Sequence, residues 1–258
     1  MEFIFKTRWL IILTALLSNP TVANIKNLHF AMLEGSEAQN ISLCVVQEAY
    51  QNIGIATTFS KFPTSRSLHA SNGGQFDGEL SRIKSISKKF GNLIRIPVPI
   101  LYMKAIAFNK KVKNFIPNGF SSLSPYRVII NHGAQFARIG TEGLPNVQIT
   151  NSYTSVFNML VHLRGDLAVA PFSNGLGLIR QLDLPEIKPL QPPLIEIPLF
   201  HFLHKKNEAL IPFVQKALKV MQKSGRIQQI YSNYLIDLVD KTIPTNFNSK
   251  NGPSVPCP

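Results

Sequence analysis

Hydrophobic and polar positions follow two periods along this 258-residue chain. Short apolar runs predict strands at 28–32, 53–59, 76–80, 103–108, 127–131, 147–149, 166–170 and 195–203, and the segment 94–99 is also apolar. Apolar residues spaced by three or four predict helices at 41–52, 63–70, 152–163, 207–224 and 226–238, and helices that begin near 134 and 175. Because strands and helices alternate, we expect an α/β fold of mainly parallel sheets with helices on both faces. The pattern begins again near residue 124, which predicts two such units.

The stretch from Phe62 to Arg82 lies in a strand–helix–strand crossover of the first unit. Arg66 lies near the start of the crossover helix, and Arg82 lies just past the strand expected at 76–80. Ligands of open α/β sheets bind beyond the carboxyl ends of the strands. A guanidinium suits a carboxylate or a phosphate, so both arginines are candidates for ligand binding. The alternative is that Arg66 pairs with Glu79 and that Arg82 is solvated.

The N-terminal residues have the pattern of a secretory signal peptide. Lys6 and Arg8 precede an apolar run at 9–17, and small residues follow at 21–23. The run is too short to span a bilayer, although a buried N-terminal element is an alternative. We expect residues 1–23 to be removed after Ala23 and the mature chain to be a soluble periplasmic protein.

Composition restricts the partners and the compartment. The chain has 27 Lys and Arg against 14 Asp and Glu, a net charge of +13, but these charges are dispersed in pairs. In an exported protein, dispersed positive charge predicts solubility and weak attraction to anionic surfaces. We expect no nucleic-acid partner. Cys44 and Cys257 pass through an oxidising route, so they either form a disulfide or remain as a buried thiol and a free tail thiol.

Other chemistries find little support in the motifs. The six histidines are scattered, and His201 and His204 would point to opposite faces of a strand, so we expect no metal site. Gly175-Leu176-Gly177 lacks the third glycine and the acidic partner of a dinucleotide-binding motif. We therefore expect no cofactor.

Several segments occur in an order that resembles a known family. They are Pro-x-x-Arg-x-Leu from Pro63, Gly-x-Phe-Asp-Gly-Glu-Leu-x-Arg ending at Arg82, and the segments 124–130, 163–170, 198–206 and 230–234. From about 28 to 238 the chain resembles bacterial extracellular solute-binding proteins of the polar-amino-acid class, which have the type II periplasmic-binding-protein fold.

This resemblance implies two lobes, each a mainly parallel sheet flanked by helices, joined by two crossing strands with a ligand clamped between them. The signal peptide would span 1–23, lobe one 24–108 and 198–245, lobe two 109–197, and an irregular tail 246–258. The chain would cross near 107–111 and return near 196–201.

The resemblance also implies a ligand site. Its segment in lobe one follows the Asp-Gly strand, and its anion site in lobe two is a helix start after a Gly turn. An ammonium-binding Asp would follow the strand at 166–170, where this chain has no acid. The expected ligand-binding residues include the two arginines and are Glu34, Arg66, Ser81, Arg82, Gly133, Ala134, Gln135, Phe172, Ser173 and Asn174.

The leading hypothesis is a monomeric periplasmic solute-binding protein without enzymatic activity. It would clamp a small anionic, carboxylate-bearing, amino-acid-like molecule and deliver it to the inner-membrane permease of an ABC transporter or to a sensor. One alternative is a dehydratase-like enzyme on the same fold, with Glu34, Glu79 and His132 as candidate acids and bases. Another is an envelope interaction protein with a degenerate cleft and a basic surface.

Overall fold

The computed structural model describes residues 27–240 and Cys257, so the expected signal peptide and most of the expected tail lie outside the described residues. The strands are β1 Asn27–Leu33, β2 Ala56–Phe62, β3 Gly78–Ile83, β4 Leu93–Asn109, β5 Val128–Asn131, β6 Val147–Thr150, β7 Leu167–Pro171, β8 Lys188–Pro189 and β9 Ile195–His204. The α-helices are α1 Glu37–Gln51, α2 Thr64–Asn72, α3 Gln135–Gly140, α4 Tyr153–Val161, α5 Phe172–Gln181, α6 Ile211–Lys223 and α7 Arg226–Val239. Short 3-10 helices are η1 Lys84–Lys88, η2 Phe120–Leu123 and η3 Lys205–Leu210.

The strands of the described residues form one sheet in the order β2-β1-β3-β9-β4-β7-β5-β6, and β8 pairs with β4. Within it, β1 is parallel to β2 and β3, and β5 is parallel to β6 and β7. The strand β9 is antiparallel to both β3 and β4. The predicted α/β class is therefore confirmed. The strands β1–β3 and β5–β7 are parallel as expected, whereas β4 and β9 pair with their neighbours in antiparallel fashion.

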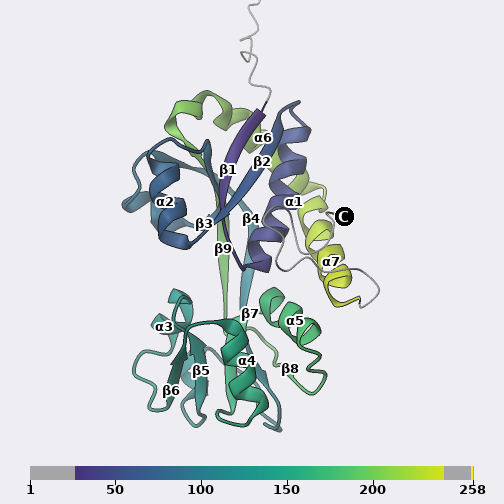
Figure 1. The fold of residues 1–258 in the computed structure, drawn as a ribbon. Coiled ribbons are helices and arrows are strands. Elements are labelled where there is room, and N and C mark those ends of the chain that lie inside the picture. Colours follow the sequence, from purple (N-terminus) through teal and green to yellow (C-terminus); the bar gives the residue numbers. More distant parts are fainter. Residues whose placement is uncertain (1–26, 241–256, 258) are drawn as a thin grey trace, which may run out of the picture.

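Two lobes lie at the ends of the long strands β4 and β9 (Figure 1). The first lobe contains β1–β3, α1, α2, α6 and α7, and the second contains β5–β8 and α3–α5. At one end of β4, Leu93 pairs with His204 of β9, and from Ala105 onward β4 pairs with β7 of the second lobe. This strand reaches the second lobe at Ala105, slightly before the expected crossing at 107–111. The exact lobe boundaries stay predictions.

Each lobe has its own apolar interior. In the first lobe, α1, α6 and α7 cover one face of the sheet, where Phe30, Ile41 and Leu218 are fully buried. The other face is covered by α2, through Leu68 against Phe202. In the second lobe, α4 and α5 cover one face and α3 the other. Helices on both faces bury the central strands, as in β7, whereas the outer strands β2 and β6 remain partly exposed.

Several elements differ from their predicted bounds; among them, the segments at 94–99 and 103–108 form the single strand β4. The strand expected at 76–80 is β3, from Gly78 to Ile83; a Cβ on Gly78 would lie 2.0 Å from the carbonyl oxygen of Phe202, so only glycine permits the close approach of β9 there. The helix expected at 207–224 is divided into η3 and α6. Asn207 has a non-helical backbone, and α6 begins with a proline in its first turn, where proline is favourable.

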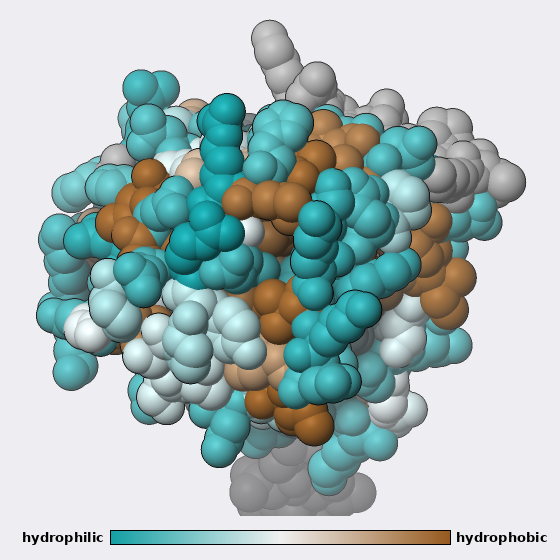
Figure 2. Space-filling view, turned by 90° about the horizontal axis from the view of Figure 1, so that it is seen from below, coloured by the Kyte–Doolittle hydropathy of each residue, from teal (hydrophilic) through white to brown (hydrophobic). Residues whose placement is uncertain are grey.

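The surface of the second lobe is mixed. Seen from below, hydrophilic residues cover most of the face, and hydrophobic residues form several separate groups (Figure 2). Small exposed apolar groups are ordinary on soluble proteins, so this face gives no argument for a protein partner.

Candidate functional site

The carboxyl ends of the three parallel strands of the first lobe lie at one edge of the sheet. Glu34 follows β1 and is exposed, Arg66 follows β2 in the first turn of α2 and is exposed, and Ser81 and Arg82 lie in the last part of β3. The strands share a register, because Leu33 pairs with Phe62 and Ala31 with Glu79. The structure therefore brings four of the predicted site residues to one edge of the sheet, which is where ligands of α/β sheets bind.

The side chain of Arg82 lies in a buried polar network. Arg82 Nε donates to Glu79 Oε2 at 2.8 Å, and Nη2 donates to Ser67 Oγ at 3.0 Å. Glu79 Oε1 also accepts hydrogen bonds from the hydroxyls of Ser67 and Ser71 on α2. The Glu79 carboxylate is fully buried and Arg82 is 7% exposed, so each charge is compensated within the lobe.

This network corrects two sequence-based expectations. Arg82 lies inside β3 rather than beyond it, and Arg82, not Arg66, is the partner of Glu79. Residues three apart on a regular strand point to opposite faces, but the β3–β9 register shifts between Glu79 and Arg82. This irregularity turns both side chains toward α2. Two of the five guanidinium N–H groups are used in the network, so Arg82 is held rigidly without exhausting its donors.

Two predicted site residues carry buried polar atoms without a hydrogen-bond partner among the described residues. They are the Oγ of Ser81, whose residue is 1% exposed, and the Oδ1 of Asn174, whose residue is 6% exposed. The backbone oxygen of Ser81 accepts from Gln39 at 2.7 Å, and Asn174 Nδ2 donates to the oxygen of Gly35 at 3.0 Å. Buried polar atoms are nearly always paired, and both residues are hydrogen-bonded to the segment 35–39 that follows β1, so their unused groups mark a candidate place for a ligand.

Asn174 reaches this site from the second lobe. It lies in the first turn of α5, directly after β7, and its partner Gly35 lies in the loop after β1 of the first lobe. A Cβ on Gly175 would lie 2.1 Å from the Phe108 ring, so glycine lets α5 start close against β4. No side chain caps the N-terminus of α5. Phe172 and Ser173 occupy the same first turn, which places the positive end of the helix dipole at the lobe interface.

The backbone N–H groups of the Gly turn in the second lobe already donate hydrogen bonds within the turn. Gly133 N donates to Asn131 Oδ1 at 3.0 Å, Ala134 N donates to the Asn131 oxygen at 3.0 Å, and Gln135 N donates to the Gly133 oxygen at 3.2 Å. The helix α3 that follows is only six residues long. An anion at this turn would therefore require these N–H groups to change partners, and the predicted role of Gly133, Ala134 and Gln135 stays a prediction.

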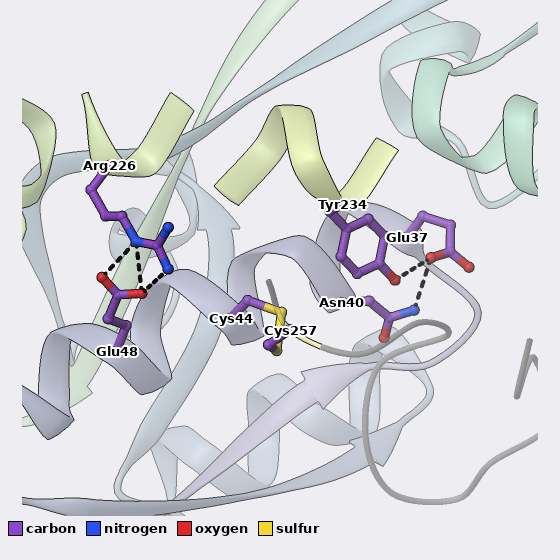
Figure 3. Close-up of a disulfide and its surroundings, with 7 residues drawn as sticks. All are labelled: Glu37, Asn40, Cys44, Glu48, Arg226, Tyr234 and Cys257. Atoms are coloured by element: carbon purple, nitrogen blue, oxygen red, sulfur yellow. Dashed lines mark hydrogen bonds and ion pairs between the residues drawn. A yellow bond between two sulfur atoms is a disulfide. The ribbon is translucent and has the colours of Figure 1, made fainter. Parts of the chain in front are cut away.

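Helix α1, whose first turn contributes Gln39 to the site, is fixed along one face (Figure 3). A disulfide joins Cys44 to Cys257. Arg226 of α7 forms a bidentate pair with Glu48 at 2.8–3.0 Å. These contacts tie α1 to α7 and to the end of the chain, so the first-lobe part of the site rests on a rigid helix pair.

A groove of about 230 Å³ lies away from the strand ends, along the crossing strands. Tyr102 and Lys104 of β4, Glu196 of β9 and Tyr231 of α7 contribute to its walls. Burial, and to a lesser extent the charge of Glu196, raises the pKa of Tyr231. None of the predicted site residues lines this groove.

The described part of the chain contains no cluster of three or more His, Cys, Asp or Glu side chains that could hold a metal ion. Among residues 27–240, no helix has both the length and the apolar character needed to cross a membrane.

Comparisons with known proteins bear on the fold. No protein-family model matches the chain. An uncharacterized protein of Shewanella oneidensis is 25% identical over 195 residues, which cover 72% of each chain. The ligand-binding core of GluR0 in complex with L-glutamate has a TM-score of 0.68 at 12% identity, over 82% of this chain and 99% of that one.

Two further solved structures have the same architecture. An amino acid ABC transporter substrate-binding protein, AbpA of Streptococcus pneumoniae, bound to L-arginine, has a TM-score of 0.65 at 12% identity, over 83% of this chain and 97% of that one. A histidine kinase sensor domain with similarity to periplasmic binding proteins has a TM-score of 0.63 at 14% identity, over 82% and 97%. Together with the crossing strands, these likenesses show that the chain has the two-lobe fold of the type II periplasmic binding proteins.

Proposed function

We propose that this protein is a periplasmic solute-binding protein that clamps a small, carboxylate-bearing, amino-acid-like ligand between its lobes. It would deliver the ligand to an inner-membrane permease of an ABC transporter or to a sensor, and return it chemically unchanged. The observation that supports the proposal is that Ser81 Oγ of the first lobe and Asn174 Oδ1 of the second are buried without a hydrogen-bond partner among the described residues, while both residues hydrogen-bond to the segment 35–39.

The donors and acceptors of the site restrict the chemistry of the ligand. The remaining N–H groups of Arg82 and the exposed guanidinium of Arg66 suit a carboxylate. The amide oxygen of Asn174 only accepts, so the ligand must present an N–H or an O–H group to it. An amide replaces the acid expected there, so this donor need not be a charged ammonium. The proposed class is an amino acid or a related hydroxy or amido acid.

The test compares the removal of two buried hydroxyl groups, one at the predicted site and one away from it. Ser81→Ala removes a hydroxyl that has no partner within residues 27–240, so the ligand-free protein should unfold at the same urea concentration as wild type. Thr57→Val is the matched control, because Thr57 Oγ1 is also buried without a partner in the described part of the chain but lies near the amino end of β2, away from the carboxyl ends of the strands.

Thermal shift against a panel of amino, hydroxy and amido acids identifies a ligand, and calorimetry then gives the affinity of each variant. Loss of one hydrogen bond should weaken binding by Ser81→Ala about 2- to 10-fold, whereas Thr57→Val should bind as wild type. A panel without any stabilising compound would count against the proposed function. Equal binding by Ser81→Ala would remove Ser81 from the site.

A further inference from the structure

Helix α5 of the second lobe is held at both ends by the first lobe. In its first turn Asn174 donates to the Gly35 oxygen, and in its last turn Arg180 Nη1 donates to the backbone oxygens of Asp237 at 3.1 Å and Leu238 at 2.8 Å. Between them, Leu176 packs against the apolar core of the first lobe, whereas Leu178 lies in the core of the second. The helix α5 therefore forms a contact between the lobes that is separate from the crossing strands.

The end of α7 is an electrostatic partner suited to Arg180. A helix C-terminus carries partial negative charge on its last carbonyl groups, and a cation in the last turn stabilises it. The last turn of α7 has no basic residue; instead it contains Asp237, and Asp240 follows as the C-cap. Arg180 of the other lobe places a cation against the last carbonyl groups of α7.

The point that Arg180 binds is fixed within the first lobe. Leu238 is fully buried in the core, and the Tyr234 hydroxyl donates to Glu37 Oε2 at 2.7 Å. The Arg226–Glu48 pair and the Tyr234–Glu37 hydrogen bond hold α7 against α1 within the first lobe (Figure 3). A side chain of the second lobe that binds this end is therefore sensitive to any rotation of one lobe against the other.

We propose that Arg180 is a positioning residue that sets the relative orientation of the two lobes, and that α5 and the end of α7 act as a lateral pivot. Figure 1 places α5 and α7 on one side of the crossing strands and α2 and α3 on the other. With the α5 side held, the lobes separate on the side of α2 and α3, and ligand enters there. The effect on ligand binding rests on the proposed function, whereas the effect on lobe orientation does not.

The experiment measures the distance between the lobes in the ligand-free protein. Nitroxide labels at Ser85→Cys in η1 and Glu142→Cys after α3 report the separation on the side opposite α5, and both positions are exposed. Arg180→Ala should raise the population with the longer label–label distance about tenfold relative to the population with the shorter one, as expected for the loss of charge-assisted hydrogen bonds. Arg180→Lys should restore part of the shorter distance, because an ammonium can also cap carbonyl groups.

Arg138→Ala is the matched control, since Arg138 is an exposed arginine in the last turn of α3 and is distant from α7. It should give the wild-type distance distribution. An unchanged distribution in Arg180→Ala, with wild-type stability in urea, would overturn the proposal; if Arg180→Ala does not fold, an unchanged distribution in Arg180→Gln would do the same. With a ligand from the screen, the affinity of Arg180→Ala should fall mainly through faster dissociation. Failure to find a ligand would affect the proposed function and leave the distance result decisive for Arg180.

Discussion

His201 makes the stability of the first lobe depend on pH. Its ring is fully buried in β9, with Nδ1 3.0 Å from the Leu80 oxygen and Nε2 3.0 Å from the Tyr50 hydroxyl. The carbonyl oxygen only accepts, so Nδ1 carries the proton and Nε2 accepts from Tyr50. The neutral ring therefore satisfies both contacts, and burial lowers the pKa of His201 from 6.5 to about 4.

The sign and the size of the effect follow from this pKa. The native pKa is below the unfolded one, so as the pH falls the unfolded state binds the proton first. The stabilisation is complete above pH 6.5 and is lost as the pH falls toward 4, with a total of about 3 kcal/mol. The pKa of Asp77 is lowered because hydrogen bonds from His29, Asn207 and Lys206 outweigh the effect of its burial, so its contribution is lost only at still lower pH.

The assay is urea unfolding of the protein between pH 8 and pH 4. Wild type should lose about 3 kcal/mol of unfolding free energy over this range through His201. His201→Gln cannot take up a proton, so its profile should be flatter by that amount, whereas the exposed His132→Gln should retain the wild-type slope. The pKa of His204 is also lowered, mainly by burial, so the wild-type loss includes His204 and only the difference between profiles isolates His201. A His201→Gln profile parallel to wild type would refute the reasoning.

Two other predictions concern the polar network and the disulfide. Arg82→Ala should lower the unfolding free energy by about 3–5 kcal/mol, because Glu79 would remain as a buried, uncompensated charge. Urea unfolding measures this loss, with the exposed Arg66→Ala as the control, and a stability equal to wild type would contradict the buried pair. Unreduced protein should contain no reactive thiol, and the double variant Cys44→Ala/Cys257→Ala should lose about 2–5 kcal/mol of unfolding free energy. Thiol counting tests the first expectation and urea unfolding the second; two reactive thiols would show that the bridge is not formed.

The order of strands and helices could be predicted because each element carries its own local pattern. The alternation of apolar residues fixed α1, α4, α7 and most strands to within a few residues. The strand-end edge that carries Glu34, Arg66, Ser81 and Arg82 followed from the same alternation, since parallel strands place their carboxyl ends together.

The partners within the site could not be predicted, because they depend on contacts between distant elements. The pairing of Arg82 with Glu79 requires an irregular β3–β9 register, which has no signal in the β3 sequence. Ser67 and Ser71 are spaced by four on α2, a pattern that could have indicated one polar helix face toward Glu79. Arg180 gave no signal at all, since the α7 end that it binds lies 57 residues later in the chain.

The place of β9 in the sheet has a consequence for the order in which the protein can fold. This strand lies between β3 and β4, although about 85 residues of the second lobe separate it from β4 in the chain. Until Ile195–His204 has emerged, β3 and β4 present facing backbone edges that have nothing to pair with. The elements β5–β8 and α3–α5 of the second lobe all precede β9 in the chain, so this lobe is synthesised before β9. A nascent or truncated chain that ends before β9 would therefore expose two open edges, which makes it prone to aggregation and a ready substrate for chaperones.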